Sequence, residues 1–126
     1  MPRSVLIVDD SALVRQCLRQ CIESDPGMVV CGEADNGAIA VEKVHQLHPD
    51  VVILDLQMPV MNGLDAARVI GVIAPQTAIV MLTLHTYDTL CHEAKAVGIR
   101  EVLSKADAVP GKLMASLKRL RARGLE

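Results

Sequence analysis

Aromatic side chains are almost absent from this sequence. Its 126 residues include no Trp, no Phe and one Tyr, although 51% of them are hydrophobic. A chain of this length forms one domain and buries roughly two-thirds of the surface of its unfolded state. The core of that domain must therefore be built from aliphatic side chains.

The sequence also lacks a strong charge of one sign, a leader peptide and a long apolar run. The formal net charge is −2, so no overall electric field favours nucleic acid or a membrane surface as a partner. Arg3, Asp9 and Asp10 interrupt the N-terminal apolar stretch, which is not the pattern of a secretory signal. The longest apolar runs are far too short to cross a bilayer. We therefore expect a cytoplasmic protein that contacts neither membranes nor nucleic acid directly.

No pair of cysteines has the CxxC spacing that is typical of zinc or redox sites. Cys17 and Cys21 lie one helical turn apart and are candidates for sharing a metal with a histidine. The more ordinary interpretation is that they are small hydrophobic groups in a reducing compartment. His45 and His48 precede Pro49 at the expected end of a helix, where a cation suits the helix dipole. No thiol or carboxylate recurs there at ligand spacing, which speaks against a metal site.

What the sequence does contain is a four-residue apolar run, Val51–Leu54, that ends at the carboxylate of Asp55. A continuous apolar run of this length is typical of a strand buried on both faces of a sheet. Pro59 prevents that strand from continuing. Open α/β sheets bind their ligands beyond the carboxyl ends of the strands, so Asp55 stands where such a ligand would lie.

Strands and helices are expected to alternate along the whole chain. Apolar runs predict strands at 5–8, 28–31, 51–55, 78–82 and 102–103. Caps, helical periodicity and breakers predict helices at about 11–24, 36–48, 64–74, 87–97 and 110–124, with a loop through Asn62 and Gly63 before the third. Five strand–helix units in strict alternation predict an α/β fold, with a parallel sheet, helices on both faces and right-handed crossovers.

At the end of each major strand stand polar residues whose side chains can bind an ion or take part in a reaction. In a parallel sheet these residues lie along one edge. Each alone has an ordinary explanation as a helix cap, a strand end or a solvated amine, but that explanation does not account for the whole set. The residues are Asp9, Asp10, Asp55, Thr83 and Lys105.

Carboxylates that meet in one crevice repel each other unless a cation lies between them. A hard divalent ion such as Mg²⁺ binds through one or two carboxylates together with phosphate oxygens and water. Lys105 adds a mobile positive charge and Thr83 a hydroxyl donor, which together suit a phosphoryl group. An aspartate with one open face is a known type of phosphoryl-accepting nucleophile. The residues alone therefore predict Mg²⁺-dependent phosphorylation of Asp55.

Five motifs in this order resemble those of a bacterial two-component response-regulator receiver domain. They are Val8–Asp10, Leu54–Pro59, Gly63, Thr83 and Lys105. The resemblance covers nearly the whole chain, and the stretches Gly32–Ala34 and Asn62–Ala66 are most similar to receivers of the NarL/FixJ type.

The resemblance implies a flavodoxin-like, doubly wound (βα)5 fold with a five-stranded parallel sheet in the order 2-1-3-4-5. It implies that residues 1–126 form one receiver domain. Receivers of the NarL/FixJ type usually continue into a helix-turn-helix DNA-binding domain. This sequence does not contain one. The resemblance implies an output that controls transcription, and the residues leave open whether the sequence is a piece of a longer protein with such a domain.

The resemblance also implies a role for each site residue. Asp55 would accept phosphate from a histidine kinase or phosphotransfer protein. Asp10 would bind Mg²⁺ directly and Asp9 mainly through water, with Asp55 and the backbone carbonyl of Gln57 completing the protein ligands.

In the same family pattern, Thr83 and Lys105 would move towards the phosphate. That movement would change the surface formed by the fourth helix, fifth strand and fifth helix, which acts on a partner, an output domain or a second copy of the chain. The domain would be a regulatory phosphoacceptor and not an enzyme, apart from catalysing its own phosphorylation and dephosphorylation.

Two residues depart from the family pattern. Val102 stands three residues before the lysine, where the family usually has Tyr or Phe, so rotation of a ring there cannot report the phosphorylated state. Tyr87, the one aromatic residue, is a candidate substitute. Leu84 follows Thr83 where the family favours a small residue. We predict that Leu84 hinders access to Asp55 and slows both transfer and hydrolysis.

Other interpretations of the same residues are weaker. Phosphatases of the haloacid dehalogenase type need a second acid two residues after the nucleophile, where this chain has Gln57. A nucleotide- or flavin-binding version of the fold would need a Gly-rich phosphate loop, which is not present. A receiver-like module for phosphate-independent dimerisation or docking remains the principal alternative.

Overall fold

The computed structural model describes residues 2–84, 88–105 and 111–124. Its five strands are β1 (Arg3–Val8), β2 (Met28–Ala34), β3 (Val51–Asp55), β4 (Ala78–Thr83) and β5 (Glu101–Ser104). Its helices are α1 (Ala12–Glu23), α2 (Gly37–Leu47), α3 (Gly63–Ile73), α4 (Asp88–Ala96) and α6 (Leu113–Gly124). The predicted starts of the fourth and fifth helices, Tyr87 and Pro110, lie outside the described residues.

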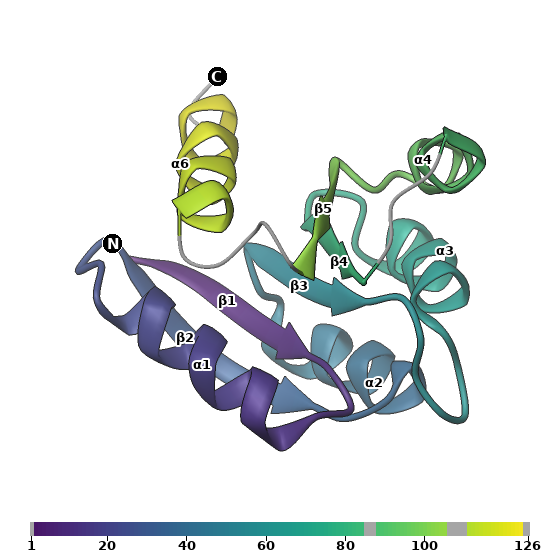
Figure 1. Ribbon diagram of the computed structural model, residues 1–126, viewed down its shortest axis with the longest axis horizontal. Helices are drawn as coiled ribbons and strands as arrows, with labels where there is room; N and C mark the ends of the chain where they lie inside the picture. Colours follow the sequence, from purple (N-terminus) through teal and green to yellow (C-terminus); the bar gives the residue numbers. More distant parts are fainter. Residues whose placement is uncertain (1, 85–87, 106–110, 125–126) are drawn as a thin grey trace.

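All strands are parallel, and their order in the sheet is β2-β1-β3-β4-β5. The predicted fold and strand order are therefore confirmed. Helices α1 and α6 cover one face, and α2, α3 and α4 cover the other (Figure 1). Every residue of β3 is buried, as expected for a central strand between two helical layers.

The two helical layers enclose two aliphatic cores. The core under α1 and α6 contains Ile7, Leu18, Ile53 and Leu117, among others. The core under α2, α3 and α4 is lined by smaller residues, including several alanines that allow these helices to approach the sheet closely. The near absence of aromatic residues is thus compensated by aliphatic side chains on both faces.

The first three helices begin beside the carboxyl edge of the sheet with a side-chain cap. Ser11, Asn36 and Asn62 each accept a hydrogen bond from the backbone N–H three residues later. Such caps satisfy amide groups that have no partner within the helix. They fix where each chain segment leaves the strand ends, which is where the predicted site residues lie.

β3 has its predicted bounds, and the other four strands are longer than predicted. The largest difference is in β2, which was predicted over 28–31 and continues to Ala34. Its pairing with β1 shifts by one residue between Val5 and Leu6, so that Val5 pairs with Val30 and Leu6 pairs with Gly32. Cys31 is the extra residue of a β-bulge.

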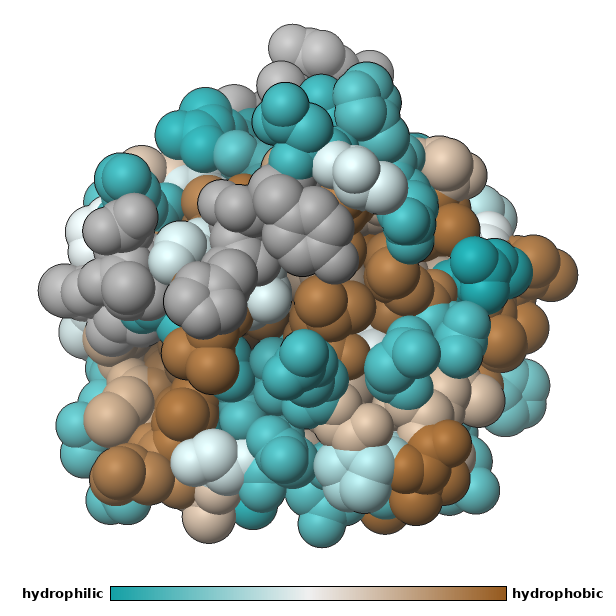
Figure 2. All heavy atoms as spheres, turned by 45° about the vertical axis from the view of Figure 1, so that its right-hand side comes forward, coloured by the Kyte–Doolittle hydropathy of each residue, from teal (hydrophilic) through white to brown (hydrophobic). Residues whose placement is uncertain are grey.

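The outer surface mixes polar and apolar side chains. Figure 2 shows hydrophobic groups between hydrophilic ones on the side that carries α3 and α4. The exposed large hydrophobic residues include Val72 and Ile73 of α3. In the part of the chain that the structure describes, no helix has the length and hydropathy needed to span a membrane.

Candidate functional site

The predicted acids meet at the carboxyl edge of the sheet. Carboxylate oxygens of Asp9, Asp10 and Asp55 all lie within 4.8 Å of one another. Asp9 and Asp10 follow β1, and Asp55 ends the neighbouring strand β3. Asp9 and Asp55 are buried, with exposed fractions of 1% and 5%, whereas Asp10 is exposed. The cluster therefore has a buried floor and an open side.

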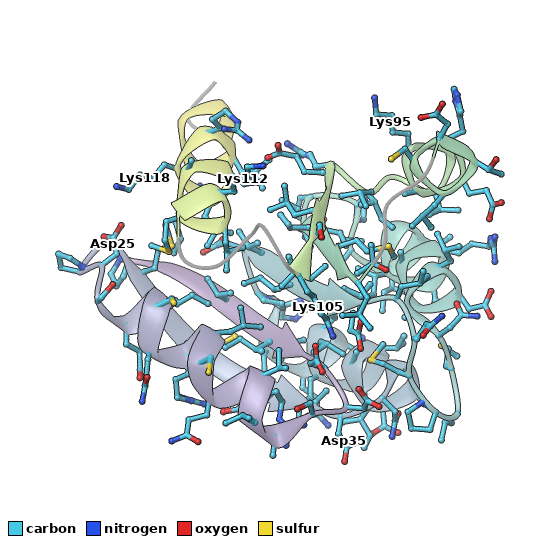
Figure 3. All side chains as sticks on the ribbon, in the orientation of Figure 1. Asp25, Asp35, Lys95, Lys105, Lys112 and Lys118 are labelled. Atoms are coloured by element: carbon cyan, nitrogen blue, oxygen red, sulfur yellow. The ribbon has the colours of Figure 1, made fainter. Side chains whose placement is uncertain are left out.

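Lys105 follows β5 and extends over the ends of the central strands (Figure 3). Its Nζ lies 2.8 Å from Asp9 Oδ2 and 3.2 Å from Asp55 Oδ1. One ammonium group therefore bridges two of the three carboxylates. A lysine can leave such a position easily, because it is a point charge on a flexible stem.

A hollow of about 220 Å³ opens above the acids. It is lined by Asp10, Asp55, Gln57, Thr83, Leu84 and Lys105. All the predicted site residues thus come together at one place, with Asp9 lying against Lys105 at the floor. A hollow of this size is large enough for a phosphoryl group and a few water molecules, and too small for a nucleotide.

The environment of Asp55 disfavours its charge. Burial raises the pKa of the Asp55 carboxyl, and the negative charge of Asp9 raises it further. Lys105 partly offsets both effects, and Asp10 adds to the increase. A second cation next to Asp55 would remove the repulsion that Lys105 leaves uncompensated.

Lys105 is held in its charged form. Burial by itself lowers the pKa of this ammonium group, but the hydrogen bond with Asp9 and the charges of Asp55 and Asp9 outweigh that effect, so the pKa is raised. Lys105 can therefore act as a permanent positive charge for an anion in the hollow and not as a proton donor.

The donor set fits a hard divalent cation. Three carboxylates offer oxygen ligands within 4.8 Å of one another, which suits Mg²⁺ better than metals that prefer nitrogen or sulfur. Among the described residues, the histidines and cysteines form no comparable group with this cluster or with each other. The alternative of a metal shared by Cys17, Cys21 and a histidine therefore has no support within residues 2–84, 88–105 and 111–124.

A close backbone approach holds the loop after β3. The N–H of Gly63, the first residue of α3, donates to the carbonyl of Leu56 at 2.8 Å. A methyl group placed on Gly63 would lie 2.2 Å from the carbonyl oxygen of Asp55. The start of α3 is therefore packed directly against the backbone of the candidate phosphoacceptor.

The sequence did not reveal a second layer of charged residues behind the acids. Arg15 of α1 donates to the carbonyl oxygen of Asp9 at 2.7 Å and to Glu33 of β2 at 2.9 Å. The helical position of Arg15 favoured a surface residue, and Glu33 lay beyond the predicted end of its strand. The one available signal for this pair was the opposite charge of Arg15, which follows the first strand, and Glu33, which follows the predicted second strand.

Comparisons of the sequence and of the structure with known proteins agree on one protein family. A family profile described as "Response regulator receiver domain" matches residues 5–118. The chain is 40% identical over 105 residues to the chemotaxis protein CheY of Thermotoga maritima. This match covers 83% of this chain and 87% of that protein. The response regulator domain of Thermotoga maritima CheB has a TM-score of 0.87 and 32% identity, and the match covers 100% of this chain and 98% of that one.

A further group of relatives is much longer than this chain. Over 66 residues the chain is 59% identical to a protein-glutamate methylesterase/protein-glutamine glutaminase of Pyrococcus horikoshii. This match covers 52% of this chain and 18% of that protein. The chain spans less than a third of the length of the methylesterases it matches. The similarity to them concerns one segment of a larger protein.

Proposed function

This chain belongs to the family of response regulator receiver domains, and on that premise we propose that it is a phosphorylation-dependent signalling switch. Asp55 accepts a phosphoryl group from a cognate histidine kinase or phosphotransfer protein. The observation that best supports this role is the cluster of Asp9, Asp10 and Asp55 with Lys105 bridging two of them. We further propose that residues 1–126 form the receiver and that it acts in the cytoplasm.

The residues around the hollow have separate tasks in the transfer. An oxygen of Asp55 forms a bond to phosphorus while the bond from phosphorus to the donor nitrogen breaks, and the departing imidazole takes up a proton. Bound Mg²⁺ would neutralise charge on the phosphoryl oxygens. We propose Asp10 as a direct ligand, Asp9 as a ligand through water, and Asp55 and the backbone carbonyl of Gln57 as the others.

Thr83 and Lys105 convert the modification into a conformational change. Lys105 pairs with Asp9 and Asp55 in this structure, and Thr83 is buried next to the hollow. A phosphoryl group on Asp55 offers both side chains new acceptor oxygens. Their movement towards it biases the equilibrium of the surface formed by α4, β5 and α6. The domain itself catalyses only its own phosphorylation and dephosphorylation.

We propose two candidate outputs for this switch. The first is a C-terminal helix-turn-helix domain that regulates transcription, and a LuxR-family regulator of Aurantimonas is among the structural neighbours, with 26% identity and a TM-score of 0.88. The second is a chemotaxis-type output, which is favoured by similarity to a chemotaxis protein and to methylesterases. Sequencing the gene beyond residue 126 distinguishes a DNA-binding domain, a hydrolase domain and a stop codon.

Labelling of the wild-type protein tests the proposed function. With acetyl phosphate and Mg²⁺, we expect one phosphoryl group per chain, mapped by mass spectrometry to the peptide that contains Asp55. EDTA should prevent the labelling. If saturating donor leaves Asp55 unmodified, the proposal is wrong, and the alternative of a phosphate-independent dimerisation or docking module is favoured.

Leu84 is expected to slow the chemistry at Asp55. It lies at the rim of the hollow with 62% of its surface exposed. We predict that Leu84→Ala speeds both labelling by acetyl phosphate and subsequent hydrolysis several-fold, because a smaller side chain opens access for donor and water. Val72→Ala is a matched control, since Val72 is an exposed apolar residue on α3. Unchanged rates in Leu84→Ala would refute the obstruction.

Val102 is not expected to transmit the signal. It is partly buried in β5, where it pairs with Met81 and packs against the core under α4. We predict that Val102→Ala costs about 1 kcal/mol of stability through lost packing. It should leave any change in dimerisation caused by beryllofluoride, a phosphoryl mimic, nearly intact. Analytical ultracentrifugation with and without beryllofluoride measures this response. A change in dimerisation with beryllofluoride in wild type that is lost in Val102→Ala would contradict the prediction.

A further inference from the structure

The peptide group that joins Asp9 to Asp10 accepts a hydrogen bond from a residue of α1. Arg15 donates one N–H from Nη1 to the carbonyl oxygen of Asp9 at 2.7 Å. The N–H of Asp9 donates to the carbonyl oxygen of Ala34, the last residue of β2, at 3.1 Å. The backbone N–H of Asp9 therefore has its partner in β2, and the carbonyl has its partner in α1.

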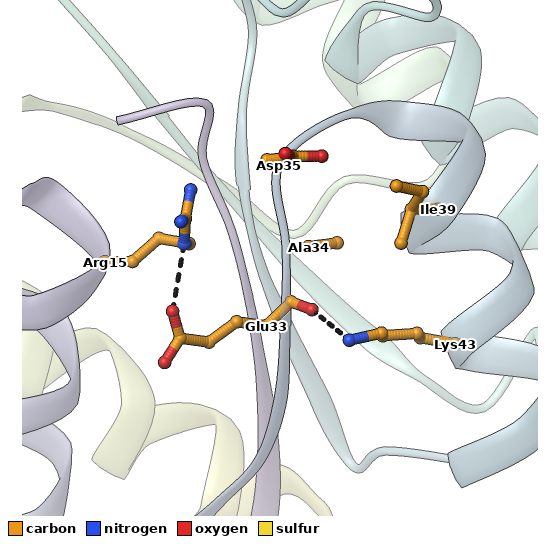
Figure 4. Close-up of a pocket in the computed structure, with 6 residues that line it drawn as sticks. All are labelled: Arg15, Glu33, Ala34, Asp35, Ile39 and Lys43. Carbon is orange, nitrogen blue, oxygen red and sulfur yellow. Dashed lines mark hydrogen bonds and ion pairs between the residues drawn. The ribbon is translucent and has the colours of Figure 1, made fainter. Parts of the chain in front are cut away.

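Glu33 fixes Arg15 in turn. Arg15 Nε lies 2.9 Å from one carboxylate oxygen of Glu33, and Arg19 Nε lies 2.8 Å from the other (Figure 4 shows the first pair). The backbone carbonyl of Glu33 accepts a hydrogen bond from Lys43 of α2. Burial by itself raises the pKa of Glu33, but the hydrogen bonds and charges of Arg19 and Arg15 together outweigh it, so the pKa is lowered. Glu33 is thus anchored to α1 through its side chain and to α2 through its backbone.

The β-bulge places Glu33 on the side of the sheet that faces α1. A strand alternates its side chains between the two faces, so one extra residue reverses the faces of all residues after it. Cys31 packs against the core under α2, and a methyl group on Gly32 would contact Leu47 of the same helix. Because Cys31 and Gly32 face the same side, Glu33 faces the opposite one, where Arg15 and Arg19 lie.

We propose that Arg15, held by Glu33, is a positioning residue for the metal-binding turn Asp9–Asp10. The inference rests on the proposed function of this site. A peptide group is planar, so fixing the carbonyl of Asp9 also fixes the nitrogen of Asp10 and limits the directions in which the Asp10 carboxylate can point. The fork of Arg15 makes both contacts at once, which the single ammonium of a lysine does not reproduce. Arg15 is not among the residues that line the hollow above the acids, so its proposed role is indirect.

Two arginine variants separate positioning from general stabilisation. Arg15→Met should weaken Mg²⁺ binding, measured by isothermal titration calorimetry, by about tenfold, as is typical when a residue that orients a metal ligand is lost. Arg19→Met is the matched control, because the recorded partners of Arg19 are Glu33 and Glu23. It should change the Mg²⁺ affinity by less than about twofold, as expected for a partly exposed ion pair.

Two further measurements distinguish a positioning role from a structural one. In the metal-free protein, hydrogen exchange of the Asp9 amide should be faster in Arg15→Met than in Arg19→Met. With saturating Mg²⁺, labelling of Arg15→Met by acetyl phosphate should recover to within about twofold of wild type, because the loss is in metal binding and not in the transfer step. If Arg15→Met does not fold, Glu33→Gln should show the same effects in weaker form.

Each outcome bears on a different statement. Equal Mg²⁺ affinity and Asp9 exchange in Arg15→Met and Arg19→Met would overturn the positioning role while leaving the proposed function intact. A wild-type protein that binds no Mg²⁺ and takes up no phosphoryl group would overturn the proposed function and this inference with it.

Discussion

Replacing Asp55 with Asn is expected to abolish phosphorylation and, in the absence of metal, to make the folded protein more stable. The amide cannot act as a nucleophile, so acetyl phosphate should leave no adduct on the peptide that contains residue 55. The same change removes a buried negative charge that lies close to Asp9 and Asp10. We expect the free energy of unfolding in EDTA at neutral pH to rise by roughly 1 kcal/mol, or about 4 °C in the melting temperature.

The sign of this effect follows from the raised pKa of Asp55. The folded protein holds a proton on Asp55 more tightly than the unfolded chain, in which a carboxyl group titrates near pH 4. Stability from this group is therefore complete below about pH 4 and is lost as the pH rises through the raised pKa. Asn carries no charge at any of these pH values. The advantage of Asp55→Asn over wild type should thus be absent below about pH 4 and greatest at neutral pH.

Mg²⁺ should narrow the difference in stability between Asp55→Asn and wild type. A ligand that binds only the folded state at ten times its dissociation constant adds about 1.4 kcal/mol. Wild type should gain this amount, and Asp55→Asn should gain less because it lacks one proposed ligand. Asp65→Asn is the control, since Asp65 is an exposed residue of α3 paired with Arg68. A melting temperature of Asp55→Asn at or below that of metal-free wild type at neutral pH would contradict the prediction.

Local patterns were sufficient to predict the sheet and the acids at its edge. The apolar run that ends at Asp55 and the breaker at Pro59 define a buried strand and its end without any tertiary information. Once five such units alternate, the rules for parallel sheets place Asp9, Thr83 and Lys105 at the same edge. The site was predictable because each of these side chains lies at or just after the end of a strand.

The supporting contacts could not be predicted in the same way. The bulge at Cys31 depends on hydrogen bonds between strands, which leave no periodic signal in either strand. Glu33 is charged and therefore does not extend an apolar run, although it belongs to β2. Arg15 binds a backbone carbonyl, and every residue has one, so no residue type marks its partner. Gly63 was expected in the loop before the third helix, and its close approach to Asp55 arises only when α3 packs against the end of β3.

Replacing Gly63 with Ala is expected to damage stability and function together. The new methyl carbon would lie 2.2 Å from the carbonyl oxygen of Asp55 and 3.0 Å from the Cα of Leu56. These neighbours are backbone atoms, which cannot rotate away as a side chain does, so α3 or the end of β3 must move. We expect a loss of about 3 kcal/mol in the free energy of unfolding, at the upper end of overpacking effects.

The same displacement should also slow phosphorylation. A shift of about 1 Å at a reacting group can cost on the order of 10²-fold in rate, and here the residue that moves is the nucleophile itself. Labelling by acetyl phosphate at saturating Mg²⁺ measures this loss, and thermal unfolding measures the stability. Gly111→Ala is the control, because a methyl group there meets no atom within 4 Å. It should be neutral or slightly stabilising, since alanine restricts the unfolded chain more than glycine.

Comparing this variant with Asp55→Asn separates two kinds of damage at one site. Asp55→Asn removes the reacting group, leaves the backbone in place and stabilises the metal-free fold. Gly63→Ala keeps every proposed reacting group and displaces the strand end that carries one of them. If Gly63→Ala were as stable as wild type and labelled at the wild-type rate, the contact of α3 with the backbone of Asp55 would have no part in holding the phosphoacceptor in position.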